Sequence, residues 1–194
     1  MEKFLLIDGN SLLFRAYYAT AFTRMLQTSY GKYTNAVVAF NNMMTNVIKD
    51  IQPDHILVAF DTKDKTFRHE MFDDYKGHRS KAPEELVEQF ETVREMIDAA
   101  GIKRLEISGY EADDIIGSFS KQHTEMEMII LTSDQDMLQL VDDNTTLLLM
   151  KKGVSDIHKI TLDNFETEYD IRPDQVIDLK AMMGDSADNI PGIP

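Results

Sequence analysis

Short apolar runs alternate with longer stretches of helical periodicity along the first 150 residues, and this alternation constrains the fold most strongly. A nearly all-apolar run of about four to eight residues is typical of a strand that is buried on both faces. Strands that alternate with helices indicate a mostly parallel sheet. We therefore predict an α/β fold, with a central sheet and helices on both of its faces. The predicted strands cover residues 4–7, 56–60, 102–107, 128–131 and 147–150.

Three stretches between these runs place apolar residues at helical spacing. The second of them begins just after Pro83, which favours the first turn of a helix, and it stops at Gly101. The spacing thus predicts a helix between each pair of consecutive strands among the first four. The predicted helices cover residues 34–50, 84–100 and 111–123.

The character of the chain changes at residue 161. Thr161 and Arg172 each begin a segment that resembles a capped helix start, and no further strand-like run follows them. We expect residues 1–160 to form the α/β core. Residues 161–194 are expected to be the start of a second, helical region that is cut short.

Composition excludes several classes of function. The chain has 34 Asp and Glu against 20 Lys and Arg, which argues against a generic basic nucleic-acid binder or a protein that coats an anionic membrane. It has no cysteine, and this excludes disulfide frameworks, thiolate nucleophiles and iron–sulfur clusters. Neither a signal peptide nor a run of about twenty apolar residues occurs in the sequence. We expect a cytoplasmic protein with no membrane partner.

Three carboxylates follow closely on predicted strands. Asp8 and Asp61 come directly after the first and second strands, and Asp134 follows the fourth after two small polar residues. In open α/β sheets, ligands bind at the carboxyl ends of the strands. A single Asp in such a place is explained equally well as a helix cap. Three together favour a ligand site at this edge of the sheet.

Six further acids fall in short motifs. One motif opens the helix predicted at 111–123, where the helix dipole favours negative charge, although three acids exceed what a helix start needs. The other motifs have the composition of capped turns, which explains any one acid in them. The six acids are Glu111, Asp113, Asp114, Asp136, Asp185 and Asp188.

The sum of these carboxylates carries the chemical argument. If they converge, their repulsion must be relieved by cations or by protons taken up at raised pKa values. Hard oxygen ligands without His or Cys favour Mg²⁺ or Mn²⁺ over zinc. Two such ions roughly 3.5–4 Å apart would clamp a phosphodiester and generate a hydroxide nucleophile.

A loop over residues 63–81 concentrates basic and aromatic residues in this acidic chain. Arg and Lys side chains neutralise phosphate oxygens, and aromatic rings stack on bases. The alternative is a solvated loop whose aromatic side chains pack into the core. Arg15 and Tyr17, which follow the first predicted strand, would add to the same surface. The candidate nucleic-acid contacts are Arg15, Tyr17, Arg68, Tyr75, Lys76 and Arg79.

Seven motifs occur in the order typical of the bacterial 5′ nuclease family, and the chain resembles that family over essentially its whole length. The family comprises the 5′→3′ exonuclease domain of DNA polymerase I and its free-standing relatives. It belongs to the flap endonuclease superfamily, which has a PIN-like core. The motifs are FLLIDGNSLLFRAY (4–17), VAFD (58–61), TFR (66–68), YKGHR (75–79), YEADD (110–114), DQD (134–136) and MGDSADNIPG (183–192).

The resemblance implies a role for each motif. Lys76 and Arg79 would contact the scissile phosphate at the base of an arch over residues 63–100, and Arg68 and Tyr75 would help to position the strand. Two Mg²⁺ ions would be bound, with Mn²⁺ as a substitute, and Asp114 belongs to a ligand motif. The implied ligands are Asp8, Asp61, Glu111, Asp113 and Asp134 for the first ion, and Asp136, Asp185 and Asp188 for the second, with Asp134 between them.

Enzymes of this family cleave DNA at 5′ ends and flaps and remove RNA primers in replication and repair. The sequence leaves open whether the chain is free-standing or precedes a polymerase domain. It also leaves open a PIN-type ribonuclease, which needs fewer acids and no arch, and a catalytically silent DNA-junction binding module. A haloacid-dehalogenase-like phosphatase fits poorly, because Asn10 stands where that chemistry needs a second Asp.

Overall fold

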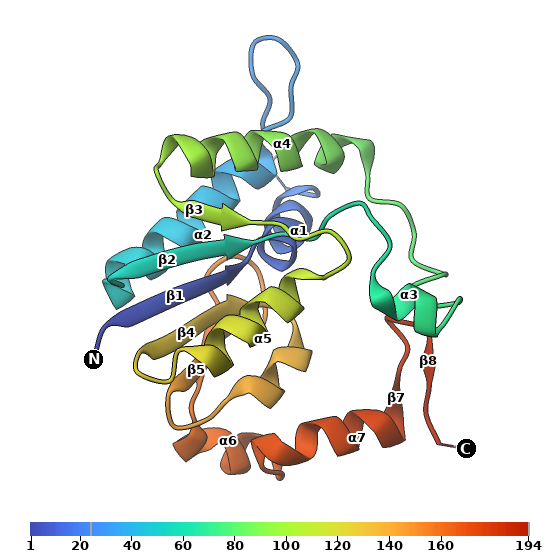
Figure 1. Cartoon of the computed structure of the whole chain (residues 1–194). Helices are drawn as coiled ribbons and strands as arrows, with labels where there is room; N and C mark the ends of the chain where they lie inside the picture. Colours follow the sequence, from blue (N-terminus) through green and yellow to red (C-terminus); the bar gives the residue numbers. More distant parts are fainter. Residues whose placement is uncertain (24, 194) are drawn as a thin grey trace.

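The computed structural model describes residues 1–23 and 25–193, which form a twisted six-stranded sheet with helices on both faces (Figure 1). The strand order is β3-β2-β1-β4-β5-β6, and a separate two-stranded pair follows near the C-terminus. The prediction of an α/β fold with a mostly parallel sheet is confirmed. The strands are β1 (Lys3–Asp8), β2 (His55–Ala59), β3 (Lys103–Leu105), β4 (Glu127–Thr132), β5 (Thr145–Met150), β6 (Ile157–Ile160), β7 (Gly184–Asp185) and β8 (Ile190–Pro191).

The helices alternate with the parallel strands, as the sequence predicts. The short helix α1, which follows β1 without a loop, was not among the predicted helices. The α-helices are α1 (Gly9–Thr20), α2 (Asn35–Ile51), α3 (Phe67–Met71), α4 (Glu84–Ala99), α5 (Ala112–Gln122), α6 (Leu162–Tyr169) and α7 (Val176–Met183), and the 3₁₀ helices are η1 (Gln135–Leu140) and η2 (Pro173–Gln175).

The parallel strands β1, β2, β4 and β5 are largely buried on both faces because neighbouring elements cover both sides of the sheet, whereas the edge strand β3 is partly exposed. In β1, Leu5 and Ile7 face a cluster that includes Phe40 of α2 and Ile97 of α4. Leu6, between them, faces a second cluster with α5, η1 and α6. The continuous apolar runs therefore serve two cores, one on each side of the sheet.

The strand order places β1 at the centre of the sheet, between β2 and β4. β1 pairs in parallel with both neighbours, so the three strands end at the same edge. Asp8 is the last residue of β1 and lies opposite Ala59, the last residue of β2. The predicted strand-end acids thus share one edge of the sheet.

Two expectations about the strands were wrong. The strand predicted at 102–107 has only the three residues of β3, and β6 adds an antiparallel edge strand that was not predicted. The C-terminal region has the expected helices α6 and α7, but it also contains the antiparallel pair β7–β8. A two-residue strand carries no periodicity that a sequence pattern could reveal. Pro194 lies outside the described residues.

The expected arch region, 63–100, contains one helix of the main core. Leu86, Val93 and Ile97 of α4 are fully buried against the sheet. The segment before α4 extends away from the sheet, and its helix α3 lies beside β7 and β8 in Figure 1.

No helix in the described residues is long and apolar enough to span a bilayer.

A glycine at the start of α1 allows the β1–α1 junction to pack closely on β2's end. A Cβ atom at Gly9 would lie 2.5 Å from Cε1 of Phe60, a fully buried ring that cannot move aside. We expect Gly9→Ala to lower the free energy of unfolding by about 1–3 kcal/mol through overpacking, as measured by urea denaturation.

Gly117 in α5 provides the matched control. Its added Cβ would meet only Leu140 side-chain atoms, the nearest at 3.6 Å. Since glycine is unfavourable inside a helix, Gly117→Ala should raise the free energy of unfolding by about 0.5–1 kcal/mol. Equal stability of Gly9→Ala and the wild type would contradict the close packing at this junction.

Candidate active site

A cavity of about 610 Å³ opens at the carboxyl edge of the sheet. Eight of the nine predicted metal-binding carboxylates line it, although they come from five separate segments of the chain. The acids that the strand-end rule and the short motifs single out therefore surround one cavity. The eight are Asp8, Asp61, Glu111, Asp113, Asp134, Asp136, Asp185 and Asp188.

The strand-end acids also serve as helix caps. Asp8 is the N-cap of α1, and its Oδ1 accepts a hydrogen bond from Ser11 N at 2.9 Å. Its Oδ2 accepts from Thr132 Oγ1 at 2.9 Å. Asp134 likewise caps η1, through a hydrogen bond from Asp136 N at 2.9 Å. The cap and the cavity roles that the sequence offered as alternatives are thus combined in the same residues.

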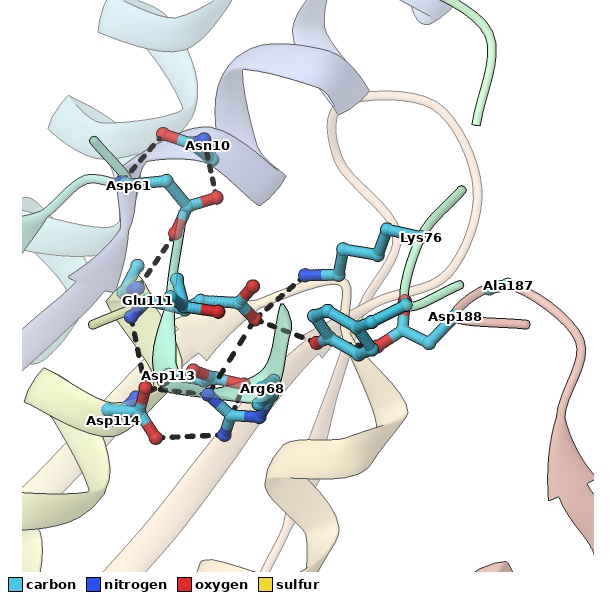
Figure 2. Close-up of polar contacts among 12 residues, drawn as sticks. Asn10, Asp61, Arg68, Lys76, Glu111, Asp113, Asp114, Ala187 and Asp188 are labelled. Atoms are coloured by element: carbon cyan, nitrogen blue, oxygen red, sulfur yellow. Dashed lines mark hydrogen bonds and ion pairs between the residues drawn. The ribbon is translucent and has the colours of Figure 1, made fainter. Parts of the chain in front are cut away.

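Asp61 connects the end of β2 to two other elements at the cavity. Its Oδ1 accepts a hydrogen bond from Ala112 N at 2.7 Å, at the start of α5, and its Oδ2 accepts from Asn10 Nδ2 at 2.8 Å (Figure 2). These bonds fix the carboxylate where α1 and α5 begin. Asn10 lines the cavity as well, although sequence reasoning gave it no positive role.

Burial makes the ionised forms of several of these acids unfavourable. Desolvation, with a smaller contribution from the nearby Asp61 and Asp134, raises the pKa of Asp8 from 3.8 to about 7. Desolvation also raises the pKa of Asp113 to about 6, against the effect of Arg68. The pKa values of Asp61 and Asp134 rise for the same first reason. A site with this charge density favours a bound cation or a bound proton.

Side chains of the basic loop bring cations to these acids. Lys76 Nζ lies 2.7 Å from Glu111 Oε2 (Figure 2), and Arg79 Nη2 pairs with Asp188. Tyr75 is buried, and its single hydroxyl hydrogen is shared between two acceptors, Glu111 at 3.1 Å and Asp188 at 3.0 Å. Burial and these two carboxylates raise the pKa of Tyr75, which keeps the phenol protonated as a donor.

The backbone of the same loop is joined to the C-terminal turn. Lys76 N donates a hydrogen bond to Asp188 O at 3.0 Å, and Asn189 Nδ2 donates to Asp74 O at 3.0 Å. Lys76 adopts a left-handed backbone conformation with φ of 56°, which is uncommon for a residue other than glycine. Such a strained conformation persists only where surrounding contacts stabilise it, and here the hydrogen bonds to the C-terminal turn do so. Lys76 in this conformation lines the cavity.

Sequence reasoning missed a third cation at the site. Lys180 of α7 lies 2.6 Å from Asp136 Oδ1 and 3.0 Å from Asp185 Oδ2. Although desolvation opposes its charge, these two carboxylates raise the pKa of Lys180. No motif marks this lysine. Its only signal is its position five residues before Asp185 on a predicted helix.

Asp114, which belongs to a predicted ligand motif, does not line the cavity. Both of its oxygens accept hydrogen bonds from Arg68, at 2.7 and 2.8 Å. Although burial opposes ionisation, these bonds lower the pKa of Asp114. Arg68 is correspondingly turned toward the acidic motif and not toward solvent. On a helix, adjacent residues point in different directions, so Asp113 and Asp114 have different surroundings.

The two candidates on α1 differ in their placement. Arg15 lines the cavity, and its guanidinium donates to the carbonyl oxygens of Lys151 at 2.7 Å and Met150 at 3.1 Å. Tyr17 is only 6% exposed and packs in the core, which corrects the expectation that it lies on the binding surface. Its neighbour Tyr18 is 53% exposed and lines the cavity instead.

The donor set suits a hard divalent cation, because it consists of carboxylate oxygens without His or Cys. Within residues 1–23 and 25–193, however, no three such side chains are arranged to hold an ion. Glu111, Asp185 and Asp188 are instead engaged by lysine and arginine side chains. Coordination would require these carboxylates to exchange one cation for another.

Comparisons with known proteins agree with the fold. The family model for the 5′-3′ exonuclease N-terminal, resolvase-like domain matches residues 3–170. DNA polymerase I of Lactococcus lactis subsp. cremoris is 45% identical over 99% of this chain, which spans 22% of that protein. A 5′-3′ exonuclease of Bacillus subtilis is 40% identical over 99% of the chain and 66% of the relative.

A solved structure supports the fold independently. The bacteriophage T5 flap endonuclease, in a pseudo-enzyme–product complex with DNA and metal ions, superposes with a TM-score of 0.77. It shares 22% identity and covers 99% of this chain and 70% of its own. The fold and the acidic sheet edge thus define an α/β domain with a carboxylate-lined cavity at the carboxyl edge of its sheet. The chain belongs to the family of 5′-3′ exonuclease N-terminal, resolvase-like domains.

The raised pKa of Asp8 predicts a pH dependence of stability in the absence of divalent cations. Between about pH 4 and 7 the folded chain retains a proton that the unfolded chain has released, because the folded pKa is about 7 and the unfolded value is 3.8. The free energy of unfolding should therefore fall as the pH rises through this window. The shift corresponds to roughly 4 kcal/mol at most.

Asp8→Asn should flatten this dependence, since the amide can still accept from Ser11 N and donate to Thr132 Oγ1. Urea denaturation in EDTA at pH 5 and pH 8 measures the effect. Asp50→Asn, at an exposed position of α2, is the control and should keep the wild-type slope. If the free energy of unfolding of Asp8→Asn changed with pH as steeply as that of the wild type, the raised pKa of the buried Asp8 would be contradicted.

Proposed function

We propose that the chain is a metal-dependent, structure-specific 5′ nuclease that hydrolyses phosphodiester bonds in DNA. It would act as a 5′→3′ exonuclease and flap endonuclease. The observation that carries this proposal is the gathering of eight carboxylates around one cavity that also has Lys76 and Arg79 in its lining. The names of the relatives support it, since one is a 5′-3′ exonuclease and another a flap endonuclease in complex with DNA.

Two Mg²⁺ ions, or Mn²⁺ in their place, fit the chemistry of the donor set. When bound, such ions supply Lewis acidity toward phosphate oxygens and lower the pKa of a bound water. The metal ions in the T5 structure support this assignment. The proposed ligands are Asp8, Asp61, Glu111, Asp113 and Asp134 for one ion, and Asp136, Asp185 and Asp188 for the other.

Basic side chains of the protein would bind the phosphate group of the substrate. Lys76 and Arg79 stand beside the carboxylates, where a phosphate anion entering the cavity would meet positive charge. Tyr75 holds their segment in place through its two hydrogen bonds to the acids. Arg15 and Tyr18 at the rim offer a cation and an exposed ring to a nucleic-acid strand.

The substrates would be 5′ ends and flaps of duplex DNA and RNA-primed duplexes, as in primer removal and repair. The chain spans only about a fifth of the length of the polymerase relatives. In a protein of that kind, a DNA polymerase domain in the same chain would be the partner. Such a protein would work in the bacterial cytoplasm, where the DNA is.

Cleavage of a labelled 5′-flap duplex in Mg²⁺ tests the proposal. We expect cleavage near the junction by the wild type and none in EDTA. Asp134→Asn keeps the cap oxygen for Asp136 N but removes charge from the cavity. It should lower kcat by about 100-fold or more.

Asp142→Asn is the matched control. Asp142 also caps a turn, by accepting from Asn144 N at 3.0 Å, but it lies outside the cavity lining. It should cleave at the wild-type rate. Binding of the flap duplex without any Mg²⁺-dependent cleavage would refute the nuclease and favour a silent DNA-junction binding module. Preferential cleavage of single-stranded RNA would favour a PIN-type ribonuclease.

A further inference from the structure

A single lysine joins two acids of the cavity that are distant in sequence. Lys180 extends from α7 and lies 2.6 Å from Asp136 in η1 and 3.0 Å from Asp185 in β7. The side chains of Lys180 and Asp136 are 40% and 36% exposed, and that of Asp185 is 20% exposed. The ammonium group is therefore partly open to solvent while it contacts both carboxylates.

The backbone fixes one of these acids toward the lysine. Asp185 Oδ1 accepts hydrogen bonds from Ala187 N at 2.8 Å and Asp188 N at 3.1 Å. Only its Oδ2 remains for Lys180. Asp136 Oδ1 approaches the same ammonium from η1. Both carboxylates line the cavity, and they are the acids proposed above as ligands of one divalent ion.

We propose that Lys180 is an internal counter-ion that takes the place of a divalent cation between Asp136 and Asp185 and competes with it for the two carboxylates. This inference rests on the proposed function for the identity of the metal ligands. Lys180 acts as a positioning residue, because it holds two acids at the site.

The physical argument is one of charge exchange. In the absence of metal, one ammonium between two carboxylates reduces their repulsion and ties α7 to η1. A divalent ion brings twice the charge and requires the same oxygens, so the ammonium must leave. The flexible four-carbon stem and the partial exposure of Lys180 allow its head group to move into water.

Calorimetric titration of the whole chain with Mn²⁺, without DNA, tests the proposal. Lys180→Met removes the charge and keeps the apolar stem, so it should bind Mn²⁺ about three- to fivefold more tightly than the wild type. Lys180→Arg should bind no more tightly than the wild type. The matched control is Lys121→Met, because Lys121 lies 2.6 Å from Asp142 outside the cavity. It should not change the affinity.

Thermal unfolding supplies a second readout. Lys180→Met should have a lower midpoint than the wild type in EDTA and a larger rise on addition of Mn²⁺, whereas Lys121→Met should keep the wild-type rise. Should Lys180→Met fail to fold, Lys180→Gln replaces it in both measurements, since its neutral amide can still donate to the carboxylates.

An unchanged or weaker Mn²⁺ affinity in the neutral variants would overturn the proposal, and so would the absence of Mn²⁺ binding to every variant. The titration contains no DNA, so it is separate from the nuclease assay. Tighter binding in Lys180→Met by a chain that does not cleave a flap would support the role of Lys180 and refute the nuclease.

Discussion

Repulsion among carboxylates at one edge of a parallel sheet is the constraint on which this structure depends. Because β1, β2 and β4 end together, Asp8, Asp61 and Asp134 meet near the same cavity. Their charge is offset in two ways. Backbone N–H groups at the starts of α1, α5 and η1 bond to these acids, and burial raises the pKa of Asp8 so that a proton is retained. Lysines and arginines neutralise the outer acids of the cavity.

The cations connect the site to the rest of the fold. The segment with Tyr75, Lys76 and Arg79 reaches the cavity from the loop before α4 and bonds to the C-terminal turn at Asp188. Lys180 approaches the cavity acids from α7. Elements far apart in sequence are thus held together by the acids between them. A change of the bound cation would therefore alter the contacts of the loop before α4, of α7 and of the C-terminal turn.

Much of the fold and the acidic site could be predicted from the sequence, because both rest on one-dimensional patterns. Continuous apolar runs indicate strands buried on both faces, and an acid after such a run lies at the ligand-binding edge. Side-chain direction has no such pattern. Tyr17 is buried while Tyr18 is exposed, and Asp114 bonds to Arg68 while Asp113 lines the cavity. The role of Lys180 depends on how α7 packs against η1, which no local motif encodes.

The most direct test of this account is an anomalous diffraction measurement on crystals of the chain grown with Mn²⁺. The central claim is that the strand-end and motif acids form one cation-binding site. We expect anomalous density inside the cavity, bounded by oxygens of Asp134 and its neighbouring acids, with the Lys180 head group displaced from Asp136 and Asp185. Mn²⁺ density only at acids outside the cavity, with Lys180 still between its two carboxylates, would contradict the account.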